Sequence, residues 1–299
     1  MPTVSLLVPL YGSSPYLDRL AADIAAQTRP FDEVLTYDDC SPDDSATKAE
    51  RLGLKVLRAS ISGRQSAARN RLLENSTSSY VHFHDHDDPI HPRFVERMLS
   101  VAGNRTIAIC DFDEVRGSKV QTHTFEKSIE DAPYELVFRK YVHVNAMLVS
   151  RDLALQSGGF DEGLTLCEEK DFLYKLLAVG GKVSILPEKL AEWKIQRTSS
   201  MNEQGWIGAA RMLRKFIRNC AMNVQPEASH KMLEYCFSSA WNYYYAEPST
   251  LSELRLMFRE LRSLGYKPRA GLGRKMERLC ALLGPVNALR LRRVIASTN

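Results

Sequence analysis

The sequence contains six cysteines, and no two of them form a CxxC pair. Paired cysteines at that spacing are typical of zinc ribbons and thioredoxin-like redox motifs, and regular cysteine frameworks are typical of small secreted domains. The scattered cysteines therefore argue against all three classes, and we interpret them as reduced, cytosolic thiols.

Long apolar runs and glycine-rich phosphate loops are also missing. No apolar run approaches the roughly 18 residues that cross a bilayer, and the chain enters the strand-like stretch Val4–Val8 without a basic leader or a cleavage site. Neither GxGxxG nor GxxxxGK[ST] occurs, which argues against Rossmann dehydrogenases and P-loop enzymes. We expect a soluble, cytoplasmic protein of another class.

Charge is unevenly distributed along the chain. Residues 205–299 contain 16 Lys and Arg against 6 Glu, a net charge of +10, whereas residues 1–204 contain 24 basic against 30 acidic residues, a net charge of −6. This asymmetry suggests an anionic partner for the basic part, although a solvated helical face is the more frequent cause. The change in character predicts two domains, 1–204 and 205–299. Helical patterns in the second lie at 209–222, 230–246, 251–264 and 274–283, and Thr250-x-x-Glu253 predicts a capping box at the start of the third.

Short strands alternate with helices in the first domain. The strand patterns lie at residues 4–10, 33–39, 55–58 and 80–84. The helix after the first strand has Ser14 as its predicted N-cap, and a second helical pattern covers residues 66–73. This alternation predicts an α/β fold, with a mostly parallel sheet flanked by helices.

Three carboxylates occupy four positions after the fourth predicted strand, in Asp85-His-Asp-Asp88. Carboxylates at that density repel one another unless a cation lies among them. Asp85 and Asp87 are two residues apart and would face the same side of an extended segment, where they suit Mg²⁺ or Mn²⁺. We expect the remaining ligands to come from water and substrate phosphates. An ordinary acidic turn before Pro89 is the simpler alternative.

A zinc site is the competing interpretation of the same stretch. His82, His84 and His86 recur at every second residue, as zinc ligands do on one strand of several metal hydrolases. The order of His86 and Asp87 is the reverse of the metallo-β-lactamase pattern, and the later histidines form no second cluster in the sequence. The magnesium or manganese interpretation is therefore favoured.

Residues suited to a nucleotide stand near the carboxyl ends of the predicted strands, where ligands bind in open α/β sheets. Pro9 and Tyr11 follow the first strand, Asp39 ends the second, and Arg69 lies on the helix before the fourth. Together these residues suit a nucleoside diphosphate. They provide a ring for stacking, a carboxylate for the N–H groups of a base, and a guanidinium for phosphate, beside a cation site.

Five segments together resemble the family 2 glycosyltransferases of the GT-A fold, and they stand in that family's order. They are Val4-Ser-Leu-Leu-Val-Pro-Leu-Tyr11, Tyr37-Asp-Asp-Cys-Ser-Pro-Asp43, Ser66-Ala-Ala-Arg-Asn70, Asp85-His-Asp-Asp88 and Gly158-Gly-Phe-Asp-Glu162. The resemblance covers about residues 4–200. It implies a GT-A fold, a nucleotide-sugar donor held by the first half, and an acceptor site built by the second half.

The resemblance also implies roles for single residues of the donor site. Pro9 and Tyr11 would lie at the nucleotide, with the ring of Tyr11 packed on the base. Asp39 would accept the imino N–H of the base, and Arg69 would lie close to the base and the diphosphate.

For the metal, the resemblance implies that Asp85 contacts the ribose or the ion. Asp87 would be the main protein ligand of a Mn²⁺ or Mg²⁺ ion that bridges the diphosphate. Asp111 and Asp113 have the same spacing and are the internal competitor. The family commonly has a strand that ends in Asp here without a metal role, so we interpret this second pair as structural.

Glu169 takes the position of the family's general base. Leu166-Cys-Glu-Glu-Lys-Asp171 resembles a helix start at which the family usually has Glu-Asp, with the second residue as the base. Because the carboxylate is one methylene longer here, Glu168 and Asp171 stay open as competitors. A carboxylate that merely favours the helix dipole is the other alternative.

Two features qualify the resemblance. In Trp193-Lys-Ile-Gln-Arg-Thr-Ser199, Gln196 stands where many members have a His that completes the metal shell, so we assign no ligand there. Lys194 or Arg197 could meet the diphosphate instead. No QxxRW motif occurs, which argues against a processive, membrane-embedded polymerase.

We therefore predict a metal-dependent, inverting glycosyltransferase. It would move a sugar from a nucleotide donor, a UDP-sugar on family frequency, to a hydroxyl of a glycan or lipid-linked acceptor. A nucleotidyltransferase of sugar phosphates and an inactive sugar-nucleotide binding module are the alternatives, and no nucleic acid partner is expected. The basic, partly apolar stretch 286–294 suits peripheral contact with an anionic membrane at its inner face, although packing on the preceding helices is the more frequent role.

Overall fold

The computed structural model describes residues 1–195, 203–223, 246–263 and 284–288, together with 236, 239–240, 242–244 and 290. The chain divides into two compact units, one of residues 1–162 and 168–197 and one of residues 163–167 and 198–299. No helix in the described ranges is both long and apolar enough to span a bilayer.

The domain boundary predicted after residue 204 stays a prediction. The helix predicted at 274–283, most of that at 230–246 and most of the stretch 286–294 lie outside the described residues.

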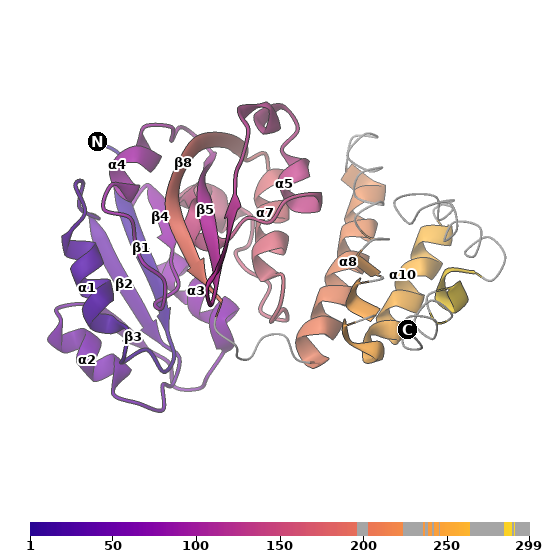
Figure 1. The fold of residues 1–299 in the computed structure, drawn as a ribbon, viewed down its shortest axis with the longest axis horizontal. Helices are drawn as coiled ribbons and strands as arrows, with labels where there is room; N and C mark the ends of the chain where they lie inside the picture. The colour runs from indigo at the N-terminus through magenta and orange to yellow at the C-terminus, as the bar shows by residue number, and fades with distance from the viewer. Residues whose placement is uncertain are drawn as a thin grey trace. The chain divides into compact units, whose positions relative to one another are not determined.

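An eight-stranded sheet forms the centre of the first unit (Figure 1). Its strands are β1 (Val4–Leu10), β2 (Glu33–Asp38), β3 (Lys55–Arg58), β4 (Tyr80–Phe83), β5 (Thr106–Arg116), β6 (Lys119–His123), β7 (Met147–Ser150) and β8 (Lys182–Lys194). The order is β3-β2-β1-β4-β7-β5-β6, and β8 also pairs with β5. Neighbours from β3 to β4 are parallel, as are β5 and β8, whereas β7 runs antiparallel to β4 and β5, and β6 to β5. The predicted α/β fold is confirmed.

Helices cover both faces of this sheet. They are α1 (Leu17–Ala25), α2 (Ser45–Arg51), α3 (Arg64–Asn75), α4 (Phe94–Leu99), α5 (Tyr134–Phe138), α6 (Arg151–Gln156) and α7 (Glu168–Ala178), with short 3₁₀ turns η1 (Lys127–Asp131) and η2 (Val144–Ala146). Phe83 of β4 contacts Phe172 of α7, and its neighbour His82 contacts Phe94 of α4. Because successive strand residues point to opposite faces, α7 and α4 lie on opposite sides of the sheet.

The apolar run of β1 explains its central position. All seven residues of the strand are buried, between β2 and β4 within the sheet and with α3 packed against it. A strand buried on both faces needs a nearly continuous apolar run, and each fully buried Leu stabilises the fold by roughly 1.5–3 kcal/mol. The core of the first unit therefore forms around the strand that the sequence predicts with the least ambiguity.

The start of α1 differs from the prediction. The helix begins at Leu17, and Ser14 is not its N-cap. The Ser14 hydroxyl donates to Asp44 Oδ1 at 2.5 Å, and the Ser14 N–H donates to Asp43 Oδ2 at 3.2 Å. The hydroxyl is used to join the β1–α1 loop to the start of α2, an interaction that local helix-capping rules do not consider.

The second unit contains α8 (Glu203–Asn223), η3 (Pro248–Thr250) and α10 (Leu251–Ser263), and α8 packs against α10. The predicted capping box at the start of α10 is wrong. Thr250 Oγ1 donates to the Glu247 carbonyl at 2.7 Å, while the Glu253 carboxylate accepts from Arg211 and Arg214 of α8 at 2.9 and 2.7 Å. Packing between the helices has taken the carboxylate that the cap would use.

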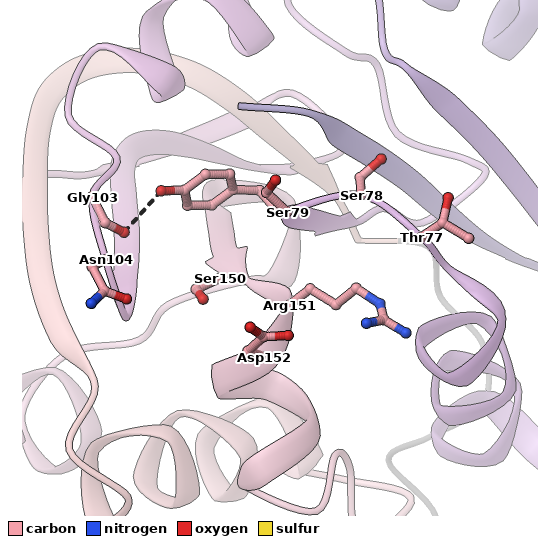
Figure 2. Close-up of a pocket in the computed structure, with 9 residues that line it drawn as sticks. Thr77, Ser78, Ser79, Gly103, Asn104, Ser150, Arg151 and Asp152 are labelled. Carbon is pink, nitrogen blue, oxygen red and sulfur yellow. Dashed lines mark hydrogen bonds between the residues drawn. The ribbon is translucent and has the colours of Figure 1, made fainter. Parts of the chain in front are cut away.

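A polar pocket of about 370 Å³ opens at the amino ends of β4 and β5 (Figure 2). Its lining residues are Thr77, Ser78, Ser79, Tyr80, Gly103, Asn104, Ser150, Arg151 and Asp152. The Tyr80 hydroxyl donates to the Gly103 carbonyl across it at 2.8 Å. The acidic turn follows the opposite, carboxyl end of β4, so this pocket is separate from the predicted site.

Candidate active site

The acidic turn begins directly after β4 and is closed by its own backbone. The N–H of Asp88 donates to the Asp85 carbonyl at 3.1 Å, and the N–H of His84 continues the β-ladder to the Leu7 carbonyl at 3.0 Å. The turn is therefore anchored to β1 at the carboxyl edge of the sheet, where α/β proteins bind their ligands.

The three alternating histidines do not form a common site. His82 and His84 are buried, and burial lowers the pKa of His84 to about 4, so its ring is neutral at pH 7. A ring nitrogen of His82, His84 and His86 lies 2.9, 3.0 and 3.2 Å from the carbonyls of Met147, Asp88 and Pro9, respectively. Because each ring is bonded to a different carbonyl, the geometry does not favour the zinc alternative.

Arg69 connects the acidic turn to the start of α7. Its side chain is completely buried, with Nη2 at 2.7 Å from Asp85 Oδ1 and Nη1 at 3.3 Å from Glu168 Oε1, and its guanidinium lies over the Phe160 ring at 5.1 Å. Burial alone would raise the pKa of Asp85, but the charge and the hydrogen bond of Arg69, together with His143 and His84, outweigh it and hold that pKa well below its usual range. Arg69 thus keeps Asp85 ionised, and its contact with a diphosphate stays a prediction.

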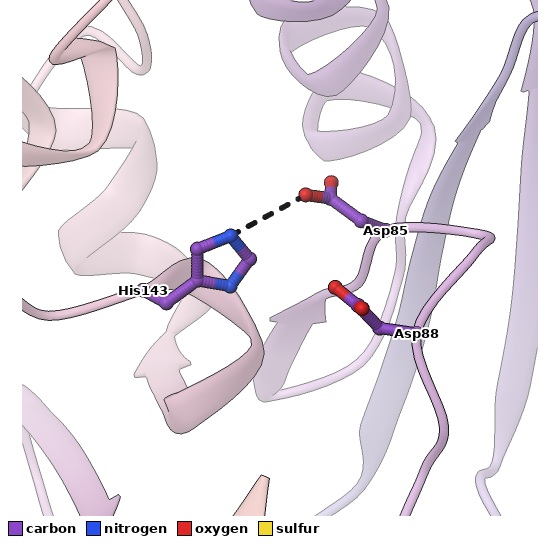
Figure 3. A group of neighbouring side chains, drawn as sticks. All are labelled: Asp85, Asp88 and His143. Atoms are coloured by element: carbon purple, nitrogen blue, oxygen red, sulfur yellow. Dashed lines mark ion pairs between the residues drawn. The ribbon is translucent and has the colours of Figure 1, made fainter. Parts of the chain in front are cut away.

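His143 also lies beside the acidic turn, so that Asp85, Asp88 and His143 form a group that could hold a metal ion (Figure 3). Its Nε2 lies 3.6 Å from Asp85 Oδ2 and 3.4 Å from Glu169 Oε1. Its Nδ1 accepts the N–H of Asn145 at 3.3 Å, and burial lowers the ring's pKa to about 4. A neutral ring that accepts at Nδ1 carries its proton on Nε2, so in this arrangement His143 donates toward the carboxylates.

Asp88 is buried and bonded on both oxygens. Oδ1 accepts the N–H of Lys194 at 2.6 Å, and Oδ2 accepts Nδ2 of Asn145 at 2.6 Å. Burial raises the pKa of Asp88 to about 8, assisted by the charge of Asp85 and opposed by the Lys194 N–H. Asp87 is half-buried and has no salt bridge to any described residue. Burial, together with the charge of Asp85, raises its pKa as well.

Glu169, the predicted base, is oriented by two side chains from the irregular segment before β7. Its Oε2 accepts the Tyr141 hydroxyl at 2.8 Å, and its Oε1 faces His143. Burial raises the pKa of Glu169 to about 7, although the charge of Arg69 and the Tyr141 hydrogen bond oppose that rise. A carboxylate whose pKa lies near neutrality suits general base chemistry.

The two competitors for the base have different surroundings. Glu168 is paired with Arg69, and burial together with the charge of Glu169 raises the pKa of Glu168 to about 7. Asp171 is completely buried, with Oδ2 at 3.7 Å from Lys175 Nζ one helical turn later. In this arrangement Glu169 and Glu168 lie at the acidic turn, whereas Asp171 is enclosed in the core.

The predicted base-binding residues lie at the carboxyl ends of β1 and β2. The Tyr11 side chain is 60% exposed and free to stack, while Pro9 is buried within β1. The Asp39 carboxylate accepts the Ser62 hydroxyl and the N–H groups of Gly63 and Arg64, each at 2.8 Å. Asp39 thus fixes the start of α3, a role that the sequence did not predict.

The competing acidic pair lies inside β5. Asp111 Oδ1 accepts the N–H of Phe125 at 2.8 Å, and Asp113 pairs with Lys189 at 2.8 Å and with the Thr122 hydroxyl at 2.7 Å. These contacts give the pair structural partners, as the sequence interpretation expected.

Three site residues were missed in the sequence, namely Tyr141, His143 and Asn145. They precede β7, and because β7 is antiparallel to β4, its start lies beside the end of β4. Recognising residues 147–150 as an antiparallel strand beside β4 would have placed these three residues at the site. Gln196 and Arg197 lie outside the described residues, so their predicted places are not described.

Comparisons with known proteins identify the family of this chain. Residues 5–154, half of the chain, match the family model described as glycosyl transferase family 2. The putative glycosyltransferase EpsH of Bacillus subtilis is 32% identical over 117 residues, which are 37% of this chain and 34% of EpsH. The chain therefore spans about a third of the length of that relative.

Solved structures share the fold at low sequence identity. S. aureus TarS, residues 1–349, superposes with a TM-score of 0.74 at 19% identity, covering 96% of this chain and 89% of that one, and TarS has also been solved with UDP-GlcNAc. The mannosyltransferase PcManGT of Pyrobaculum calidifontis, solved with GDP-Man and Mn²⁺, gives a TM-score of 0.59 at 15% identity, covering 98% and 87%.

Proposed function

The chain belongs to glycosyl transferase family 2, and from this premise we propose that it transfers a sugar from a nucleoside diphosphate donor to an acceptor hydroxyl, with inversion. The acceptor is a glycan or a lipid-linked sugar. One observation carries the proposal: Arg69 joins Asp85 of the acidic turn to Glu168 of α7, and His143 lies beside both Asp85 and Glu169. A cation site for a departing diphosphate and a base for an attacking hydroxyl are then neighbours.

The acidic turn fits a divalent cation. Its donors are hard carboxylate oxygens, and burial together with the charge of Asp85 raises the pKa of Asp87, a penalty that a cation would relieve. We propose that Asp85 and Asp87 hold Mn²⁺ or Mg²⁺, and the Mn²⁺ of the similarly folded PcManGT supports this. When bound, such an ion supplies positive charge to the diphosphate leaving group. His143 and Asp88 are the alternative ligands, and both are already engaged in hydrogen bonds.

Glu169 acts as the general base. It takes the proton from the acceptor hydroxyl as the oxygen attacks the sugar carbon from the face opposite the diphosphate, which inverts that carbon. The Tyr141 hydroxyl and the His143 Nε2 proton hold its two oxygens in place.

We propose that the donor carries uracil or thymine, with UDP first. Asp39 has about four acceptor positions on its two oxygens, and the start of α3 uses three of them. One position is left for a base N–H, which matches the single imino N–H of uracil better than the two N–H groups of guanine. Tyr11 supplies an exposed ring for stacking, and the UDP-GlcNAc complex of TarS supports the same choice.

We place the reaction in the cytoplasm, with no nucleic acid partner. The net charge of +10 in residues 205–299 supports peripheral contact with an anionic membrane, where lipid-linked acceptors are found.

A donor panel tests the proposal. UDP-, dTDP- and GDP-sugars are incubated with the protein and Mn²⁺, with EDTA as the control, and the released nucleotide is quantified. We expect UDP release from a UDP-sugar and none with EDTA. Faster release of GDP from a GDP-sugar would overturn the assignment of uracil as the donor's nucleobase. Binding of a donor without release of any nucleotide would indicate an inactive module.

A further inference from the structure

We propose that Asp88 and Asn145 are a positioning pair that sets the acidic turn for its cation and the donor diphosphate. The inference rests on the proposed function and deepens it. Asp88 then acts through hydrogen bonds and is not itself a ligand of the ion, although it belongs to the group of side chains that could hold one.

Asn145 is buried in η2, directly before β7, and contacts two segments from other parts of the chain. Its Oδ1 accepts the N–H of Asp85 at 3.0 Å, and its Nδ2 donates to Asp88 Oδ2 at 2.6 Å and to the Glu192 carbonyl at 3.2 Å. A backbone N–H can only donate and a carbonyl can only accept, so these partners fix which end of the amide faces which group. The side chain therefore clamps the first and last residues of the acidic turn in one orientation.

Asp88 completes the clamp from the other side. It is 1% exposed, and its two oxygens accept Asn145 Nδ2 and the N–H of Lys194, each at 2.6 Å. Lys194 is the last residue of β8, and Asn145 lies just before β7. The pair therefore joins the turn after β4 to the start of β7 and to the end of β8. To ligate an ion, Asp88 would have to use an oxygen that already accepts a short hydrogen bond, at a side chain that is almost completely buried.

The clamp formed by Asp88 and Asn145 orients the carboxylates of Asp85 and Asp87. Asp85 is the first clamped residue and Asp87 directly precedes the last, so the direction of their carboxylates depends on where Asp88 and Asn145 hold the backbone. Displacement of a bound group by about 1 Å can cost on the order of 100-fold in activity. Loss of the pair should therefore weaken the cation-dependent part of nucleotide binding.

A reciprocal exchange tests the inference, with Asp88→Asn, Asn145→Asp and the double variant. In Asp88→Asn, an amide N–H of one side chain would point at another N–H donor. In Asn145→Asp, two carboxylates would lie against each other. In the double variant, Asn at 88 can donate to Asp at 145 and still accept from Lys194, while Asp at 145 still accepts from Asp85. Only the bond to the Glu192 carbonyl is lost.

The readout is the ratio of UDP affinity with and without Mn²⁺, measured by calorimetry, with GDP and dTDP used if UDP does not bind. We expect each single variant to lower the ratio about 10-fold or more, and the double variant to restore it to at least three times that of either single variant. Asn70→Asp is the matched control, because that amide joins α3 to the 158–162 turn. It should lower the melting temperature and leave the ratio unchanged.

Each result has a defined meaning. If the double variant binds no better than Asp88→Asn, a carboxylate is required at position 88 and Asp88 is a ligand, which overturns the inference. Single variants with the wild-type ratio overturn it as well. Failure of the wild-type protein to bind any of the three nucleotides with Mn²⁺ overturns the proposed function, and the inference with it. Melting curves of all variants confirm that folded protein is compared.

Discussion

The carboxylates at the carboxyl edge of the sheet differ in their partners, and these partners set their roles. Asp85 is held ionised by Arg69, Asp88 is bonded on both oxygens, and Glu169 is oriented by Tyr141. Asp87 alone among the three aspartates of the turn lacks such a partner in the described structure. A side chain held by protein donors is costly to redirect toward a ligand, whereas a half-buried carboxylate without them is available.

Asp87→Asn should remove cation-dependent nucleotide binding. The amide keeps the size of the side chain but loses the charge that a divalent ion needs, so we expect a loss on the order of 10–100-fold or more in Mn²⁺-dependent UDP affinity, measured by calorimetry. Asp111→Asn is the control, since Asp111 is bonded to the N–H of Phe125 inside the sheet. Equal losses in both variants would mean that Asp87 is not the distinguishing ligand.

Glu169→Gln should separate binding from turnover. The amide is close in size to the carboxylate and lies off the diphosphate, so donor affinity should stay within about twofold while turnover falls by roughly 10²–10⁴-fold, as for a lost general base. Glu168→Gln should be mild, because the amide oxygen can still accept from Arg69. Near wild-type transfer by the Glu169 variant would refute the assignment, and exchange of the two phenotypes would move the base to Glu168.

The sequence predicted the acidic turn and the glutamates of α7 because their order along the chain resembles a known series. It did not predict Tyr141, His143 or Asn145, since these are single residues of an irregular segment that only the antiparallel pairing of β7 with β4 brings to the site. No local pattern distinguishes such residues from ordinary core side chains. The assigned roles of Asp39, Arg69 and Asp87 remain predictions.

At the scale of secondary structure, α3 is fastened to the turn that precedes α7. Asn70 accepts the N–H of Phe160 at 2.8 Å and donates to the Phe160 carbonyl and to Glu162 Oε1, both at 3.0 Å. Gly158 and Gly159 both adopt positive φ, at 78° and 64°. Only at Gly159 would a Cβ overlap the Asn70 side chain, whereas the space around Gly158 is open.

Gly159→Ala should therefore destabilise the protein more than Gly158→Ala. A left-handed backbone costs a non-glycine residue roughly 1–2 kcal/mol at either position, which corresponds to a few degrees in melting temperature. Gly159→Ala adds the clash with Asn70, and differential scanning calorimetry should show the larger shift for it. Equal shifts would mean that the Asn70 bonds contribute little to stability.

The β1–α1 loop is fastened to α2 in a pH-dependent way. Asp43 accepts the N–H of Ser14 and the N–H and hydroxyl of Ser45. Burial raises the pKa of Asp43, but these hydrogen bonds outweigh it and the pKa is lowered overall. A lowered folded-state pKa means that this stabilisation is present above the unfolded pKa of about 3.9 and is lost as the pH falls through the folded value.

Asp43→Asn should thus lower stability at pH 7 and lose its effect in acid. Urea unfolding of the variant and the wild type at several values between pH 7 and pH 3 measures the difference, which should be constant down to about pH 4 and shrink below it. A difference that does not change with pH would show that the charge of Asp43 has no part in holding the loop.

The strands from β1 to β4 were predicted because apolar runs of that length suit a buried parallel sheet. Two helix starts were predicted incorrectly, at Ser14 and at Thr250, for the same physical reason. In each case a tertiary contact takes the group that a local cap would have used: Asp44 bonds Ser14, and two arginines of α8 bond Glu253. Local rules describe competition within one segment and carry no information on such distant partners.

For the whole molecule, the fold class and the family were predictable from the sequence, while the substrates were not. No motif in the sequence specifies the sugar or the acceptor, and the low identity of the solved neighbours limits their support to the fold. We therefore propose the class of reaction, the transfer of a sugar with release of a nucleoside diphosphate.

The phosphorus-containing product distinguishes a glycosyltransferase from a nucleotidyltransferase. The protein is incubated with Mg²⁺ and UDP-GlcNAc in one sample and with UTP and a sugar 1-phosphate in another, and ³¹P NMR identifies the products. We expect UDP in the first sample and no pyrophosphate in the second, with the UDP signal lost in Glu169→Gln. Pyrophosphate in the second sample, without UDP in the first, would contradict this expectation and identify a nucleotidyltransferase.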